Sequence, residues 1–89
     1  EKILGEGVFV GKNAIINADA EVDRMAIINT NALVEHECIV GEYAHVAVGA
    51  VLCGQARVGR ASFIGANATV IQGRTIEVKT IVPAGAVVR

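Results

Sequence analysis

Large aliphatic residues recur at every sixth position along the chain, from Leu4 to Val88. Each position in this series holds Leu, Ile or Val: Leu4, Val10, Ile16, Val22, Ile28, Val34, Val40, Val46, Leu52, Val58, Ile64, Val70, Ile76, Val82 and Val88. An amphipathic helix repeats its apolar residues about every 3.6 positions, so a strict period of six does not predict helices. It predicts short strands joined by sharp turns, repeated without a break.

Two other positions of the six-residue unit are restricted as well, when the aliphatic residue is taken as the first. The second position favours Gly, Asn and Asp, at residues 5, 11, 17, 23, 29, 41, 59 and 65. These residue types tolerate positive φ and tight corners, so we expect the chain to turn there. The fifth position is small or medium in size in every unit except one, where Arg74 stands.

Three strands of this kind close a triangular coil of eighteen residues, and stacked coils pair as parallel sheets about 4.8 Å apart. Large aliphatic residues then fill the prism, and the small residues of the fifth position fit where its walls converge. The pattern therefore predicts an all-β fold, a parallel β-helix of about five triangular coils that covers residues 1–89. In such a fold, residues eighteen apart in sequence stack directly on one another.

Two features interrupt this regularity. In the unit VIQGRT (residues 70–75), Ile71 replaces a corner residue and Arg74 replaces the small one. Either a coil bulges there or the surface is shaped for a ligand. The repeat also runs into both ends of the chain, and a stacked array needs caps at its ends. We therefore expect residues 1–89 to be one module of a longer protein.

Composition and charge exclude several classes of function. The formal net charge is −1 and the basic residues form no patch, which argues against a nucleic-acid partner. No apolar run approaches the roughly 18 residues of a membrane span, and no signal peptide is visible. Cys38 and Cys53 lack metal-ligand spacing and are expected to be free thiols in a reducing cytosol. These features predict a cytoplasmic protein.

Both histidines of the chain lie in the segment VEHECIVGEYAHVAV, residues 34–48. Glu37 follows His36, and a carboxylate can hold one imidazole nitrogen while the other acts as a base. Gly54 stacks on His36 one coil higher, where its missing side chain leaves room and a backbone N–H. A base beside a bare N–H suits acyl transfer, because the N–H binds the developing oxyanion. An ordinary exposed histidine is the alternative interpretation of His36.

The second histidine, His45, lies nine residues after the first. Nine residues are half a coil, so one molecule places His36 and His45 on different walls of the prism. His45 should stack between Ile27 and Phe63. A second subunit brings the two histidines together most easily, which predicts a site shared between subunits.

The repeating pattern [Leu/Ile/Val]-Gly-x-x-Ala-x resembles the hexapeptide repeat of the left-handed β-helix acyltransferases, over essentially the whole chain. The left-handed coil is implied by this resemblance alone, since parallel crossovers are usually right-handed. The segments INTNALVEHECIVGEYAHVAVGAVLCG and VGRASFIGANATVIQG closely resemble a subfamily, the bacterial sialic-acid O-acetyltransferases and UDP-4-amino-sugar N-acetyltransferases.

This resemblance implies a role for each candidate residue. His36 would be the general base, Glu37 its orienting carboxylate, and His45 a neighbour of the acetyl group of acetyl-CoA. The backbone N–H of Gly54 would hold the thioester carbonyl, and the pantetheine would run near Ala66 and Gly73. Members of the subfamily are trimers and usually carry an N-terminal nucleotide-sugar-binding domain, which is absent from residues 1–89.

The sequence thus predicts a homotrimeric enzyme of bacterial sugar biosynthesis with active sites between subunits. It would transfer an acetyl group from acetyl-CoA to an amino sugar or sialic acid by direct attack, without a metal. A zinc site like that of β-helical carbonic anhydrases needs three histidines, and this chain has two. An acyl-cysteine mechanism at Cys53 is disfavoured because no base is placed for it. The alternative function is a catalytically silent β-helix that serves as a trimerisation or scaffold module.

Overall fold

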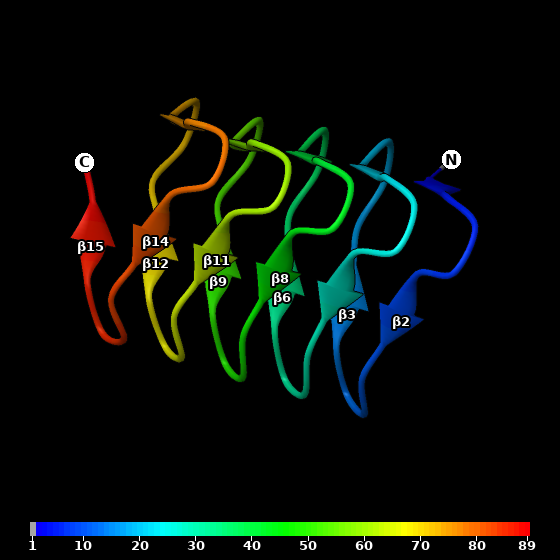
Figure 1. The fold of residues 1–89 in the computed structure, drawn as a ribbon, viewed down its shortest axis with the longest axis horizontal. Helices are drawn as coiled ribbons and strands as arrows, with labels where there is room; N and C mark the ends of the chain where they lie inside the picture. Colours follow the sequence, from blue (N-terminus) through cyan, green and yellow to red (C-terminus); the bar gives the residue numbers. More distant parts are fainter. Residues whose placement is uncertain (1) are drawn as a thin grey trace.

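The computed structural model describes residues 2–89. It contains fifteen strands of two residues each, joined by corners and arranged in three parallel sheets (Figure 1). Sheet A contains β1 (Ile3–Leu4), β4 (Glu21–Val22), β7 (Ile39–Val40), β10 (Arg57–Val58) and β13 (Thr75–Ile76). Sheet B contains β2 (Phe9–Val10), β5 (Ile27–Ile28), β8 (His45–Val46), β11 (Phe63–Ile64) and β14 (Ile81–Val82). Sheet C contains β3 (Ile15–Ile16), β6 (Leu33–Val34), β9 (Val51–Leu52), β12 (Thr69–Val70) and β15 (Val87–Val88).

The strands follow one another from sheet A to B to C, so that three strands and their corners complete one coil. The five coils stack along the long axis, from the blue N-terminal end to the red C-terminal end in Figure 1. Every paired residue lies opposite the residue eighteen positions away; Phe63, for example, pairs with His45 and Ile81. The predicted β-helix of about five triangular coils is therefore confirmed. Its left-handedness stays an expectation from the resemblance.

The core is a column of aliphatic and small residues inside the prism. The first-position residues of the middle coils are buried completely, as Ile28, Val40 and Leu52 show. The small fifth-position residues between them, such as Ala44 and Ala56, are equally buried. This packing agrees with the roles predicted for the two positions.

The corners differ from the prediction in one respect. Positive φ occurs at the fourth position of the unit, every six residues from Gly7 to Gly85, and not at the second. The glycines of the second position answer a different need, since a Cβ at Gly41 would lie 2.6 Å from the backbone nitrogen of Arg60. They allow the backbone of the next coil to approach closely. Asp23 and Asn29 occupy the same position and accept a hydrogen bond from the following N–H.

The irregular unit at residues 70–75 contains no bulge. The N–H of Gly73 donates to the carbonyl of Gly54 at 3.0 Å, and the carbonyl of Arg74 accepts from the N–H of Arg57 at 2.8 Å. Strand β13 then pairs with β10 in the ordinary register. Because the hydrogen bonds and the register are regular, the predicted alternative of a bulged coil is wrong. The Arg74 side chain is exposed.

Three edges separate the walls of the prism, and they are named here after the sheets that they join. The A–B edge comprises residues 5–8, 23–26, 41–44, 59–62 and 77–80, and the B–C edge residues 11–14, 29–32, 47–50, 65–68 and 83–86. The C–A edge comprises residues 17–20, 35–38, 53–56 and 71–74.

Within residues 2–89 the fold contains no helix long and apolar enough to cross a membrane.

Candidate active site

His36 and Glu37 form a hydrogen-bonded pair on the C–A edge. Nδ1 of His36 lies 3.2 Å from Oε1 of Glu37, and each side chain is 53% exposed. Glu37 occupies a fourth position with φ 61°, and its N–H donates to the carbonyl of Ala18. A carboxylate can only accept, so Nδ1 carries the proton and Nε2 presents its lone pair. An imidazole held in this way can accept a proton at Nε2.

Gly54 lies directly against the imidazole of His36, one coil further along the chain. A Cβ at this position would lie 2.5 Å from Nε2 of His36, so any larger residue would displace the ring. Gly54 is buried, and its N–H donates to no acceptor among residues 2–89. The predicted stacking of His36 and Gly54 is therefore confirmed, and a backbone donor without an internal partner lies beside the imidazole.

Polar neighbours support this corner from both sides. The amide of Asn17 donates to Glu35 at 2.8 Å, and the amide of Gln55 lies 3.5 Å from the carboxylate of Glu37. Gln55 is the residue predicted to stack on Glu37, eighteen positions later. The imidazole of His36 and the carboxylate of Glu37 thus lie among amide and carboxylate groups of the neighbouring coils.

The two cysteines are free thiols. Cys38 is fully buried, and its thiol donates to the carbonyl of Cys53 at 3.1 Å. Burial raises the pKa of the Cys38 thiol, which makes it a poor nucleophile. Cys53 is half-buried beside Gly54, and neither histidine forms a hydrogen bond with its sulfur in the described part of the chain.

His45 lies on the outer face of sheet B, between Ile27 and Phe63 as predicted. Its ring meets that of Phe63 edge-on, with centroids 5.1 Å apart and an interplanar angle of 79°. Nε2 of His45 lies 3.1 Å from Nδ2 of Asn29, on the B–C edge. The sequence analysis missed this contact. The spacing of the two residues could have indicated it. One coil is eighteen residues, so residues sixteen apart lie on neighbouring coils, displaced by two positions, and can contact each other diagonally.

The six candidate residues fall into three places. His36, Glu37, Gly54 and Gly73 share the C–A edge, His45 belongs to sheet B, and Ala66 lies on the B–C edge. A single chain therefore brings His36, Glu37 and the Gly54 amide together, but places His45 and Ala66 elsewhere on its surface.

Charge is distributed unevenly around the prism. Among residues 2–89, the Asp, Glu, Lys and Arg side chains lie on sheet A, at its two edges or directly before β1, with two exceptions: Lys12 on the B–C edge and Arg89 directly after β15. The outer faces of sheets B and C are apolar apart from His45 and Thr69. They expose large side chains, among them Phe9 (57%), Ile81 (74%) and Ile15 (54%).

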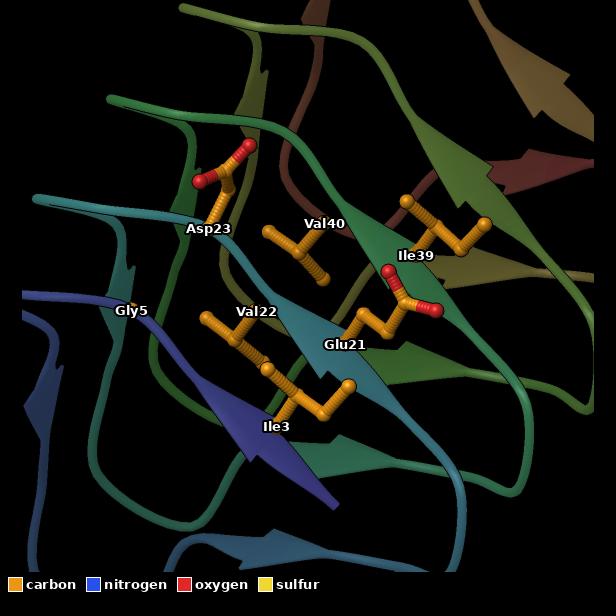
Figure 2. Close-up of a pocket in the computed structure, with 7 residues that line it drawn as sticks. All are labelled: Ile3, Gly5, Glu21, Val22, Asp23, Ile39 and Val40. Carbon is orange, nitrogen blue, oxygen red and sulfur yellow. The ribbon is translucent and has the colours of Figure 1, made fainter.

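A hollow on sheet A is separate from these candidate residues. It is lined by Ile3, Gly5, Glu21, Val22, Asp23, Ile39 and Val40. Figure 2 shows Ile3, Glu21 and Ile39 side by side on neighbouring strands of this wall. The hollow contains no histidine, and residues 2–89 include no group of three or more metal-ligating side chains.

Comparison with solved structures relates this fold to sugar acetyltransferases. The chain superposes on PerB from Caulobacter crescentus, solved with CoA and GDP-perosamine, with a TM-score of 0.86 and 38% identity. A mutant of the perosamine N-acetyltransferase from the same organism gives a TM-score of 0.86 and 37% identity. The acetyltransferase domain of PglB from Neisseria gonorrhoeae FA1090 gives 0.75 and 30%.

Each of these alignments covers 99% of this chain but only 45–46% of the matched chain. The chain thus spans less than half the length of these three structures. No family model matches it.

Proposed function

Because these structures confirm the predicted resemblance to the bacterial sugar acetyltransferases, we propose that the chain transfers an acetyl group from acetyl-CoA to the amino group of a nucleotide-linked sugar. One observation carries the proposal: the His36–Glu37 pair lies over Gly54, whose N–H has no internal acceptor. The matched enzymes are N-acetyltransferases or bind CoA and an amino sugar, which favours an amine acceptor over the hydroxyl of a sialic acid.

In the proposed reaction, the neutral amine of the acceptor attacks the carbonyl carbon of the thioester. A C–N bond forms, the C–S bond breaks, and the proton of the amine passes to Nε2 of His36. The Gly54 N–H donates to the carbonyl oxygen while negative charge develops on it. CoA leaves as a thiolate and takes up the proton from His36, which returns the base to its starting state. The role of Ala66 and Gly73 along the pantetheine stays a prediction.

We propose that the site is completed in a homotrimer. Sheets B and C carry apolar outer faces and meet at the B–C edge, whereas sheet A is charged. If sheet C of one subunit packs on sheet B of the next, three B–C edges converge at the symmetry axis and sheet A faces water. The C–A edge with His36 then lies beside the sheet B that carries His45 of its neighbour.

The two free cysteines support a reducing, cytosolic location.

A charge on sheet C is expected to break this trimer, and the same charge on sheet A is not. Ile15 on β3 and Ile3 on β1 belong to the same coil and are similarly exposed, at 54% and 59%. Ile15→Glu would bury a carboxylate in the interface, whereas Ile3→Glu would leave it in water. Analytical ultracentrifugation should give trimers for the wild type and Ile3→Glu and monomers for Ile15→Glu. A wild-type monomer at micromolar concentration would contradict the shared site.

Replacing Glu37 with glutamine should slow acetyl transfer less than removing His36 does. Glutamine keeps an oxygen that can accept from Nδ1 of His36, so the ring stays oriented while the negative charge is lost. Initial rates at saturating acetyl-CoA measure the effect. A loss as large as that of His36→Ala would mean that the charge, and not the orientation, is the main contribution of Glu37.

The decisive test of the proposed function is acceptor-dependent release of free CoA thiol from acetyl-CoA, with GDP-perosamine and related 4-amino sugars as acceptors. Binding of acetyl-CoA alone should raise the melting temperature, because a ligand that binds only the folded state stabilises it. No stabilisation and no thiol release would favour the scaffold module instead.

A further inference from the structure

The outward side chains of sheet A form a series whose two halves are complementary in charge. In strand order they are Ile3, Glu21, Ile39, Arg57 and Thr75, each lying beside the next in the register of the sheet. An isoleucine occupies the middle strand, an acid lies one strand before it and a base one strand after it. The two end positions carry no charge.

The acid and the base of this series have no partner within the described chain. Glu21 and Arg57 lie two strands apart, roughly 10 Å at the usual spacing of parallel strands, with Ile39 between them. Both side chains are exposed, and neither forms a hydrogen bond or an ion pair there. At the neighbouring A–B edge, by contrast, Arg24 is already paired with Glu42 at 2.9 Å. The outer face of sheet A therefore presents one available acid and one available base, placed symmetrically about its middle strand.

We propose that sheet A is a docking surface for a second copy of this chain, related to the first by a two-fold axis that runs along β7. Such an axis places Ile39 of one copy against Ile39 of the other. It also brings Glu21 of each copy opposite Arg57 of the other, so that two ion pairs form. The uncharged ends of the series, Ile3 and Thr75, then face each other. This is an isologous contact, in which one surface is complementary to itself.

Charge selects this arrangement over the other way of pairing the same face. A two-fold axis along the stack of coils would keep the coils of the two copies parallel and set each strand against its own copy. Glu21 would then face Glu21, and Arg57 would face Arg57. Like charges in contact disfavour an interface, whereas opposite charges fix its register. The antiparallel arrangement makes both contacts attractive.

The hollow on sheet A provides the receiving side of each ion pair. Ile3 and Ile39 flank Glu21 on the neighbouring strands, and Asp23 follows directly after β4 (Figure 2). In the antiparallel arrangement, Arg57 of the other copy faces the centre of this hollow. Its methylene groups can pack on the two isoleucines, while its guanidinium group reaches the carboxylates.

The contact is small and is expected to be transient. The chain measures 27 × 24 × 20 Å, so one wall offers less than the roughly 800 Å² per partner of a standard interface. Interfaces below this size belong to weak complexes, which form only at high protein concentration. Sheet A is also the wall that the proposed homotrimer leaves free. The same contact would therefore join two single chains or two trimers.

Sedimentation velocity from micromolar to millimolar concentration at low salt tests this docking surface without any substrate. The average mass of the wild type should at least double over this range, and the increase should disappear at high salt, which screens exposed charges. Glu21→Arg and Arg57→Glu should each abolish the increase, because each variant places like charges opposite one another twice. Circular dichroism should show both variants folded, since both positions are exposed.

Recovery of the contact is the sharper part of the test. An equimolar mixture of Glu21→Arg and Arg57→Glu should associate as the wild type does, because one variant presents two bases and the other two acids. The double variant Glu21→Arg/Arg57→Glu contains the same changes as the two single variants and should associate with itself. A constant wild-type mass, single variants that still associate, or a mixture that does not recover would each overturn the proposal. A wild type of constant mass that binds phosphatidylglycerol vesicles through Arg57 would identify an anionic membrane as the partner instead.

Discussion

Replacing Val40 with aspartate is expected to prevent folding. Val40 is completely buried in β7, between Val22 of β4 and Val58 of β10 in the register of sheet A. An aspartate there would put a carboxylate into a dry column whose other members are aliphatic, with no partner within reach. Burying an unpaired polar group costs on the order of several kcal/mol. The free energy of unfolding of a small domain is only about 5–15 kcal/mol, so a loss of this size is enough to unfold it.

The preceding residue provides a matched control. Ile39 is the other member of β7 and points outward, between Glu21 and Arg57 on the neighbouring strands. Ile39→Asp makes the same chemical change on the solvent side, where Arg57 can pair with the new carboxylate. Circular dichroism should show a folded Ile39→Asp and an unfolded Val40→Asp. Two equally folded variants would mean that the period of six has been assigned the wrong phase.

The architecture could be predicted from the sequence because a strict repeat gives every residue a fixed position in the coil. Once the period of six and the triangular coil are set, the neighbour of each residue is the one eighteen positions away. His45 between Ile27 and Phe63, and His36 over Gly54, follow from this rule and are confirmed. The His36–Glu37 contact is predictable for a local reason, since the two residues are adjacent.

The geometry of the corners is less visible in the sequence. The fourth position has positive φ in every described unit, yet it holds residues as different as Glu37, Tyr43 and Lys79. Stacking of identical corners imposes this conformation on whatever residue is present, so composition does not reveal it. The glycines of the second position are conspicuous, but they serve close approach between coils and not positive φ.

Two features of the candidate site could not be predicted from the sequence of one chain. The Asn29–His45 hydrogen bond depends on side-chain directions at a corner, which a stacking rule does not contain. The proposed meeting of His36 with His45 depends on how subunits associate, and the argument for the proposed association is the apolar surface of sheets B and C. That surface is recognised only after the strands have been assigned to walls.

Removing the imidazole of His36 tests the chemistry most directly. In the proposed reaction, Nε2 of His36 accepts the proton of the amine while the C–N bond forms. Among the described residues of the C–A edge, the other basic side chain is Arg74, which stays protonated and cannot accept a proton. The Gly54 N–H and the binding of both substrates do not depend on this proton transfer. The loss should therefore appear in the chemical step, and the ability of the chain to bind acetyl-CoA should be preserved.

His36→Ala is accordingly expected to lower kcat by about 10²–10⁴-fold, the usual contribution of a general base, with acetyl-CoA affinity nearly unchanged. Initial rates with a 4-amino-sugar acceptor measure the first quantity, and calorimetric titration with acetyl-CoA measures the second. Glu6→Ala is a suitable control, because Glu6 is also an exposed third-position residue but lies on the A–B edge. Near-normal turnover in a folded His36→Ala would show that the base lies elsewhere. A large loss of acetyl-CoA affinity would instead move His36 from the acceptor to the cofactor side of the site.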